Sequence, residues 1–195
     1  MNKPTPPLML PPEEAEALRM AYDEAGVILE YGSGGSTVMA AQLPGKTVFS
    51  VESDPSWHRH LADLFRAAPP AAQVVLHHAD IGRTRDWGYP DGTQNAARWP
   101  GYAVSVWDRL DFRHPDVVLI DGRFRAACFL TTLFRITHPV TVLWDDYKDR
   151  DRYHFVEDFC PLTGMVGRMA IFTAQPMAIP AEKLGLILTT FLRPQ

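Results

Sequence analysis

Apolar residues gather in five short runs along the chain, and a segment with helical periodicity follows each of them. The runs occupy residues 27–30, 46–53, 73–81, 115–121 and 139–146. Short continuous apolar runs are typical of strands buried on both faces, and helical connections are typical of parallel sheets. The alternation therefore predicts an α/β fold: a doubly wound, mostly parallel sheet with helices on both faces.

The expected helices repeat apolar positions every three or four residues. They occupy residues 12–25, 37–43, 54–68, 102–110, 124–136 and 152–160. Asp54 and Pro55 suit the start of the third helix, because Asp caps free amides and Pro is pre-set for the first helical turn. Two further apolar runs, near 165–172 and 186–192, have only a loop between them. They predict an antiparallel C-terminal edge hairpin that completes a seven-stranded sheet.

Two segments lie outside this alternation. Residues 1–11 are rich in proline and are expected to form an extended N-terminal arm. The polar segment 82–99 carries turn residues together with Trp87, Tyr89 and Trp99. A segment of this length suits either a lid over a bound substrate or a static cover over the sheet edge. The remaining pattern is continuous, so residues 1–195 are expected to form a single domain.

The composition limits the cellular compartment and the classes of binding partner that we expect. Apolar residues make up 46% of the chain and charged residues 22%, which is ordinary for a soluble globular protein. The net charge of -4 disfavours nucleic acid and anionic membranes as partners. No run approaches the ~20 apolar residues of a membrane span, and the proline-rich start lacks a signal-peptide core. Cys128 and Cys160 have no close-spaced partner. A cytoplasmic protein with buried thiols is expected.

The chemically informative residues stand where the predicted strands end. In a parallel sheet these ends share one edge, and ligands bind there, near the point where the strand order reverses. The first strand ends at Glu30 and leads into a turn whose bare backbone suits a polar or anionic ligand. The turn consists of Gly32, Ser33, Gly34, Gly35, Ser36 and Thr37.

Acidic residues end the next two strands. Glu52 ends the second and lies twenty residues beyond Gly32, a spacing at which a carboxylate can bind ribose hydroxyls. Asp80 ends the third and is followed by Ile81, so that the carboxylate can accept from an adenine amino group while Ile81 packs on the ring. A turn-forming aspartate explains Asp80 equally well.

Three aspartates end the fourth and fifth strands, Asp121 on one and Asp145-Asp146 on the other. Carboxylates on adjacent strands repel one another unless a positive group lies among them. The candidates for that group are Arg123, Arg125, a sulfonium and a hard divalent cation.

These strand ends resemble the class I S-adenosylmethionine-dependent methyltransferases over residues 27–192. The residues that carry the resemblance are Glu30, Gly32, Gly34, Gly35, Ser36, Glu52, Asp80 and Asp121. Ser36 departs from the family, which often has a third glycine there, but a helix start accepts serine. The nicotinamide-binding fingerprint G-x-G-x-x-G fits less well, because its sixth position is Thr37 here.

The resemblance implies S-adenosylmethionine as the cofactor and a small-molecule acceptor. By position, Gly32 to Gly35 would face the methionine part of the cofactor, with Glu30 near its amino group; Ser36 and Thr37 also count among the cofactor-binding residues. Glu52 and Ser53 would bind the ribose, and Asp80-Ile81 the adenine. Asp121 would lie by the sulfonium, and Asp121 and Asp145 are the candidate catalytic bases.

The aspartate cluster also looks like the metal site of the cation-dependent, catechol-type O-methyltransferases. That resemblance implies Mg²⁺ on Asp121, Asp145 and Asp146, although the branch has an Asp-Asn pair where this chain has Asp-Asp. The alternative is that Asp145 and Asp146 cap the fifth strand and engage Arg123 or Arg125. Three other functions stay open: a catalytically silent S-adenosylmethionine-binding protein, a nicotinamide-dependent oxidoreductase, and aminopropyl transfer from the decarboxylated cofactor.

Overall fold

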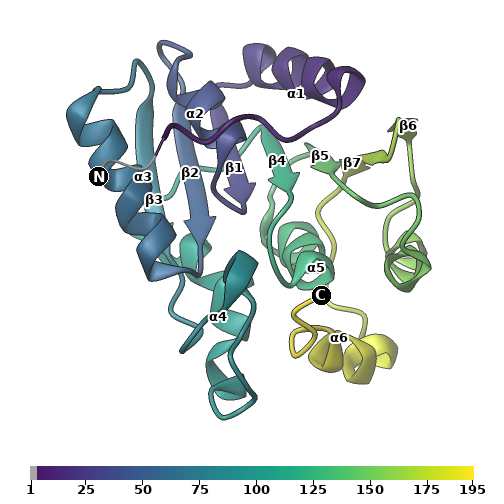
Figure 1. The fold of residues 1–195 in the computed structure, drawn as a ribbon. Coiled ribbons are helices and arrows are strands. Elements are labelled where there is room, and N and C mark those ends of the chain that lie inside the picture. The colour runs from purple at the N-terminus through teal and green to yellow at the C-terminus, as the bar shows by residue number, and fades with distance from the viewer. Residues whose placement is uncertain (1–3) are drawn as a thin grey trace.

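A seven-stranded sheet forms the centre of the protein in the computed structural model, which describes residues 4–195 (Figure 1). Along the sheet the strands follow the order β3-β2-β1-β4-β5-β7-β6. Their bounds are β1 Val27–Tyr31, β2 Thr47–Glu52, β3 Gln73–His78, β4 Val117–Ile120, β5 Val140–Trp144, β6 Gly164–Val166 and β7 Met169–Ala174. Strands β1 to β5 run parallel, and β7 runs antiparallel to β5 and β6. The predicted fold class is confirmed.

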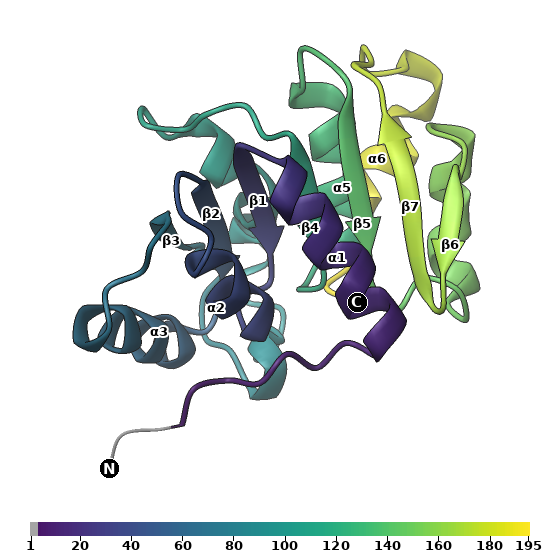
Figure 2. The ribbon, with the colours of Figure 1, turned by 90° about the horizontal axis from the view of Figure 1, so that it is seen from above.

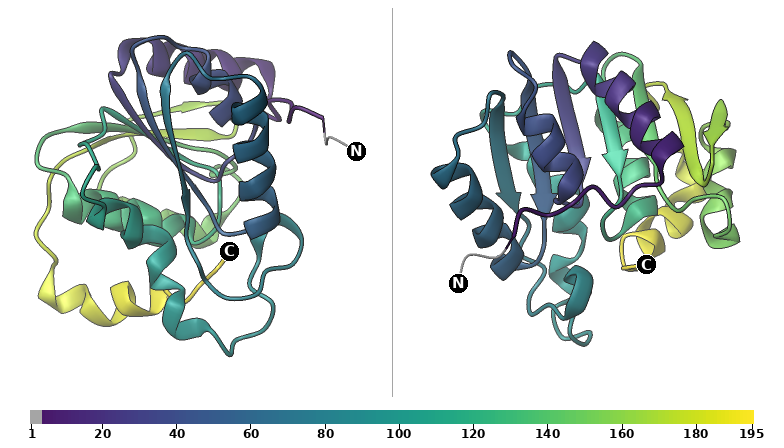
Figure 3. Two further views of the ribbon diagram at one scale, coloured as in Figure 1. Left: turned by 90° about the vertical axis from the view of Figure 1, so that its left-hand side faces the viewer. Right: turned by 45° about the horizontal axis from the view of Figure 1, so that its top comes forward.

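Helices cover both faces of the sheet. Helices α1, α2 and α3 lie on one face, and α4, α5 and α6 lie on the other (Figures 2 and 3). Their bounds are α1 Pro12–Glu24, α2 Gly35–Ala41, α3 Pro55–Ala67, α4 Pro100–Val104, α5 Arg125–Arg135 and α6 Leu184–Thr190. Within residues 4–195, none of the helices has both the length and the apolar character needed to cross a membrane.

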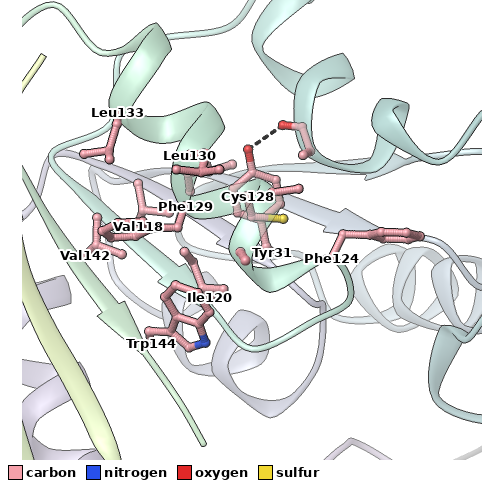
Figure 4. Packing of buried hydrophobic residues seen from close by; sticks show 14 of the residues in the cluster. Tyr31, Val118, Ile120, Phe124, Cys128, Phe129, Leu130, Leu133, Val142 and Trp144 are labelled. Carbon is pink, nitrogen blue, oxygen red and sulfur yellow. Dashed lines mark hydrogen bonds between the residues drawn. The ribbon is translucent and has the colours of Figure 1, made fainter. Parts of the chain in front are cut away.

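The strands alternate their side chains between two cores, one under each helix layer. Ile28 packs in the core under α1 and α2, whereas its neighbour Leu29 packs in the core under α5. In the second core Phe129 of α5 meets Trp144 of β5, with ring centroids 5.4 Å apart (Figure 4). Full burial of each such side chain contributes about 1.5–3 kcal/mol. Cys128 lies in this core, and both cysteines are free and buried.

The C-terminal segment differs from the prediction. The antiparallel hairpin exists, but both of its strands lie within residues 164–174, and the predicted strand at 186–192 is helix α6 instead. A short apolar run such as 186–192 does not distinguish a strand from a helix by itself. The fold resolves the ambiguity, because Ile187 and Thr190 are buried at helical spacing while Leu188 between them is exposed.

Two other predicted helices are shorter or tighter than expected. The helix at 102–110 is α4 followed by a 3-10 turn, Ser105–Asp108, and the helix at 152–160 is the 3-10 helix Asp151–Asp158. The polar segment 82–99 contains two further 3-10 turns, Asp86–Gly88 and Ala96–Arg98.

The proline-rich arm is extended, as predicted, although residues 1–3 of it lie outside the described part. It runs from α3, across the start of α2, to the first turn of α1 (Figure 3). The Pro4 carbonyl lies 3.2 Å from Nε2 of His60 in α3. Farther along, Leu8 and Leu10 pack against the core under α1 and α2. The arm thus passes directly over the turn that follows β1.

Candidate functional site

A cavity of about 920 Å³ opens at the carboxyl ends of β1, β2, β4 and β5. The strand order reverses between β1 and β4, which is where open α/β sheets bind ligands. The volume of the cavity falls in the range of cofactor and small-molecule sites. The wall consists of the glycine-rich turn, the ends of β2, β4 and β5, the segment Trp87 to Tyr89, arm residues 4–10, and four arginines.

Hydroxyl groups and one indole hold the glycine-rich turn in place. Ser50 of β2 lies 2.7 Å from the Ser33 hydroxyl and 3.0 Å from the Thr37 hydroxyl. The Gly34 amide donates to Thr37 Oγ1 at 2.9 Å, and Trp57 of α3 donates to the Ser33 carbonyl at 2.7 Å. The turn is therefore pre-formed, which limits the ordering that a ligand would otherwise have to impose.

The glycines of the turn differ in what lies next to them. Gly32 has φ +104°, and a Cβ there would lie 2.7 Å from the Gly122 amide, so β1 and β4 approach too closely for a side chain. A Cβ on Gly35 would overlap the Pro7 carbonyl of the arm. Nothing in residues 4–195 lies within 4 Å of the corresponding position at Gly34. Gly34 is thus the turn residue whose bare face is open to a ligand.

Glu30 lies behind the turn rather than on the cavity wall. It is fully buried, and Tyr22 of α1 donates a 2.7 Å hydrogen bond to its Oε1. Burial raises the pKa of Glu30, while hydrogen bonds from Thr37 and Tyr22 oppose the shift. Its Oε2 has no hydrogen-bond partner among residues 4–195. The hydroxyls of Ser36 and Ser50 also lie near this carboxylate and act against the rise in its pKa.

Glu52 and Ser53 lie on the wall at the end of β2. The Glu52 Oε1 atom accepts from the Ser53 and Asp54 amides at 2.7 and 2.8 Å. These two bonds fix the position of the carboxylate. Burial raises the pKa of Glu52, and the two amide bonds oppose that rise.

Asp80 and Ile81 stand apart from the other predicted residues. The Asp80 carboxylate accepts from the Gly82 amide at 2.9 Å and pairs with Arg98 at 3.0 Å. Ile81 is buried in the core under α5. Neither residue, nor Glu30 or Thr37, lines the cavity, whereas the other predicted site residues meet there.

Asp121 is recessed in the cavity at the end of β4. Arg125 donates to its Oδ1 at 3.1 Å. Burial raises the pKa of Asp121 to about 6; Arg125 opposes this rise, and the neighbouring Asp145 and Asp146 add to it. The carboxylate is therefore mostly ionised at neutral pH, close to the value that suits a general base.

Asp145 and Asp146 at the end of β5 are held by arginines. Asp145 is 2% exposed, and both of its oxygens accept from Arg168, at 3.0 and 2.9 Å. Asp146 pairs with Arg150 and Arg168, and Arg125 lies 3.7 Å away. The sequence left open that the two aspartates engage Arg123 or Arg125, and the structure shows such a pair between Asp146 and Arg125. Arg168, which pairs with both aspartates, was not predicted from the sequence.

Comparison with known proteins identifies the family. Protein-family models gave no match, and neither did a search of curated proteins. A solved structure of a methyltransferase-like protein from Silicibacter pomeroyi is 52% identical, with 97% of this chain and 99% of that chain covered and a TM-score of 0.95. The chain belongs to the class I S-adenosylmethionine-dependent methyltransferase family.

More distant methyltransferases share the fold. The O-methyltransferase TomG from Streptomyces achromogenes, solved with S-adenosylmethionine, is 18% identical with a TM-score of 0.58, covering 86% of this chain and 82% of that one. An O-methyltransferase from Bacillus cereus, solved with S-adenosylhomocysteine, is 13% identical with a TM-score of 0.56, covering 84% and 82%.

The aspartate cluster of this methyltransferase does not fit a divalent cation. A Mg²⁺ site needs carboxylate oxygens that are free to coordinate, but each of the three aspartates accepts from an arginine. Within residues 4–195, no group of three or more acidic, His or Cys side chains is arranged to hold a metal. The guanidinium groups of Arg125 and Arg168 occupy the position among the carboxylates that a cation would need.

Several residues of the site were not predicted from the sequence. Arg150 and Arg168 follow β5 and β6, and Trp57 and Tyr102 come from α3 and α4. None of them belongs to a motif, and only the paths of the hairpin and the helices bring them to the cavity. The prolines made the extended arm recognisable in the sequence, but nothing in the sequence indicated that it would pass over Gly35.

Proposed function

We propose that this methyltransferase binds S-adenosylmethionine in the cavity at the ends of β1, β2 and β4 and transfers its methyl group to a small-molecule acceptor. The observation that carries the proposal is the meeting of the Gly34 face, Glu52 and Asp121 in one cavity of about 920 Å³. Such a volume accommodates a nucleoside cofactor and a small acceptor together.

The residues present fit the cofactor. Gly34 offers an open backbone for the methionine part. Glu30 is fully buried behind the turn, so its carboxylate would act on the cofactor's ammonium group at a distance, without direct contact. Glu52, fixed by two amides, presents its second oxygen to ribose hydroxyls. The remaining assignments are Ser33, Gly35, Ser36 and Thr37 shaping the turn, Ser53 beside the ribose, and Asp80 with Ile81 near the adenine. For that contact Asp80 must exchange its Arg98 partner for an adenine amino group.

Bound S-adenosylmethionine would supply an electrophilic methyl group, and the protein would position the acceptor and manage its proton. Asp121 is the base that we assign, because its carboxylate opens into the cavity and is ionised near neutral pH. Asp145 is assigned a positioning role, since Arg168 occupies both of its oxygens. Arm residues 4–10 and the segment Trp87 to Tyr89 would enclose the acceptor.

The test is a transfer assay with S-adenosylmethionine labelled on its methyl group. Wild-type protein, Asp121→Asn and a control variant, Asp111→Asn, would be incubated with a panel of small alcohols, phenols, amines and thiols. Asp111 pairs with Arg109 and does not line the cavity. We expect label in a small-molecule product from the wild type and the control, and at least about a hundredfold less from Asp121→Asn.

Two outcomes would count against the proposal. Label found instead in protein or nucleic acid added in parallel would contradict a small-molecule acceptor. Binding of S-adenosylmethionine without transfer to any of the panel, protein or nucleic acid would favour a catalytically silent binding protein.

A further inference from the structure

One cation in the cavity wall has no anionic partner. Four arginines line the cavity: Arg123, Arg125, Arg150 and Arg168. The last three are paired with the aspartates at the ends of β4 and β5. The Arg123 side chain forms no ion pair or hydrogen bond with any of residues 4–195, and its Nε is buried without an acceptor. Arg123 is therefore the cavity arginine that forms no ion pair within residues 4–195.

The Arg123 guanidinium is nevertheless held in place. It lies over the Tyr89 ring, 4.2 Å from the ring centroid, and Arg85 approaches the same ring at 5.7 Å. The Tyr89 segment is itself anchored, because the Ser53 hydroxyl donates to the Gly88 carbonyl at 3.0 Å. Stacking fixes the plane of a guanidinium but leaves its in-plane N–H donors free.

A half-buried cation with free donors is costly unless an anion compensates it. The group that matches a planar fork of N–H donors is an oxyanion that can accept two parallel hydrogen bonds, such as a carboxylate or a phosphate. Asp121, Asp145 and Asp146 pair with the other arginines. Glu52 and Asp54, the remaining acids of the wall, accept from backbone amides and form no ion pair with Arg123. An anionic group of a ligand in the cavity would give Arg123 the direct partner that the wall does not supply.

We propose that Arg123 anchors a carboxylate or phosphate group of a ligand in this cavity. The inference rests on the proposed function, which makes the cavity a methyl-transfer site. Two sources offer this chemistry: the carboxylate on the methionine part of the cofactor, and an acidic group on the acceptor. The two sources predict different losses when the charge of Arg123 is removed.

The test compares Arg123→Met with the wild type by isothermal titration calorimetry. Arg152→Met is the matched control, because Arg152 also stacks on a tyrosine, 4.9 Å above the Tyr153 ring, but outside the cavity. The first two probes are S-adenosylhomocysteine and 5′-methylthioadenosine, which lacks the amino-acid part; both are titrated into the free protein. The other two, benzoate and inorganic phosphate, are titrated into protein saturated with S-adenosylhomocysteine.

If Arg123 binds the cofactor carboxylate, Arg123→Met weakens S-adenosylhomocysteine binding by about tenfold or more and leaves 5′-methylthioadenosine unchanged. If it binds an acidic acceptor, S-adenosylhomocysteine is unchanged and the binding of benzoate or phosphate is lost. Arg152→Met behaves as the wild type in both cases.

The proposal is overturned if Arg123→Met binds S-adenosylhomocysteine within twofold of the wild type and the anions either do not bind the wild type or bind both proteins equally. Failure of the wild type to bind S-adenosylhomocysteine would instead overturn the proposed function. The same anion titrations on the free protein would then still decide the role of Arg123.

Discussion

Asp121 combines access to the cavity with a tuned acidity. Its neighbours act in opposite directions, because Arg125 favours the ionised carboxylate while burial and the other two aspartates favour the protonated one. The balance sets the pKa at about 6, well above that of an exposed aspartate. A carboxylate with this value is ionised at pH 7 but remains basic enough to take a proton from an acceptor.

We predict that one aspartate of the folded protein titrates near pH 6. The measurement is the pH dependence of the side-chain carboxyl ¹³C shifts in protein labelled on aspartate. The signal should disappear in Asp121→Asn and remain in Asp111→Asn. Because the protonated carboxyl cannot act as a base, methyl transfer that needs Asp121 should fall as the pH drops through about 6. An Asp121 signal that titrates near pH 4 would contradict the assignment.

The N-terminal arm packs directly against the glycine-rich turn. The Pro7 carbonyl packs where a side chain on residue 35 would project, whereas the same position on Gly34 is open. These two adjacent glycines thus have different surroundings: Gly35 accommodates the arm, and Gly34 faces the open space in which we propose that the cofactor binds.

We predict that Gly35→Ala releases the arm and that Gly34→Ala does not. Limited digestion with thermolysin, which cleaves on the amino side of residues such as Leu8 and Met9, measures this release through mass spectrometry. Cleavage of the arm should become at least about tenfold faster in Gly35→Ala, because the added methyl group displaces the arm backbone. Gly34→Ala should match the wild type in digestion but lose S-adenosylhomocysteine binding. Equal protection of the arm in all three proteins would refute this division of roles.

The β6–β7 hairpin contributes to the site through Arg168. This residue lies in the turn between the two strands, and its amide donates to Oε1 of the buried Glu14 at 3.0 Å. Its side chain compensates Asp145, which is 2% exposed. The Arg168 side chain is 40% exposed, so the pair is only partly buried. Removing Arg168 still leaves the buried Asp145 carboxylate without its countercharge, which is more costly than losing an exposed pair.

We therefore predict that Arg168→Met lowers the free energy of unfolding by about 2 kcal/mol, between the values for exposed and buried pairs. Arg150→Met, which removes a partner only from the more exposed Asp146, should lower it by less than about 1 kcal/mol. Urea unfolding followed by circular dichroism measures both values. Equal stability of the two variants would show that Asp145 does not depend on Arg168.

The sequence predicted the site to the extent that strand ends determine it. Glu52 and Asp121 each end a parallel strand, so their meeting at one edge follows from the fold class. Arg168 and Pro7 reach the same cavity through a hairpin and an arm whose paths depend on distant packing, which no local pattern encodes. The predicted strand at 186–192 failed for a related reason: its apolar run fits either element until the core selects the helical face with Ile187.

For the whole molecule, the arginine-filled aspartate cluster separates this protein from the metal-dependent branch that part of its sequence resembles. We predict that ligand binding does not require a divalent cation, because Asp121, Asp145 and Asp146 already have guanidinium partners. The affinity for S-adenosylhomocysteine should be the same within twofold in EDTA and in Mg²⁺, and Mg²⁺ alone should give no saturable heat. A Mg²⁺ isotherm that disappears in Asp145→Ala would contradict this prediction.

We propose that a nucleoside cofactor with a sulfonium occupies the cavity at the ends of β1, β2 and β4. Calorimetric titration with S-adenosylmethionine, S-adenosylhomocysteine and NADH tests it most directly. Glu52→Ala is the site variant, and the matched control is Asp63→Ala, which alters an exposed acid on α3. We predict micromolar binding of both sulfur compounds to the wild type and the control, a loss of about tenfold or more in Glu52→Ala, and no binding of NADH. If neither sulfur compound bound, or if NADH bound more tightly than both, the cavity would not be a site for S-adenosylmethionine.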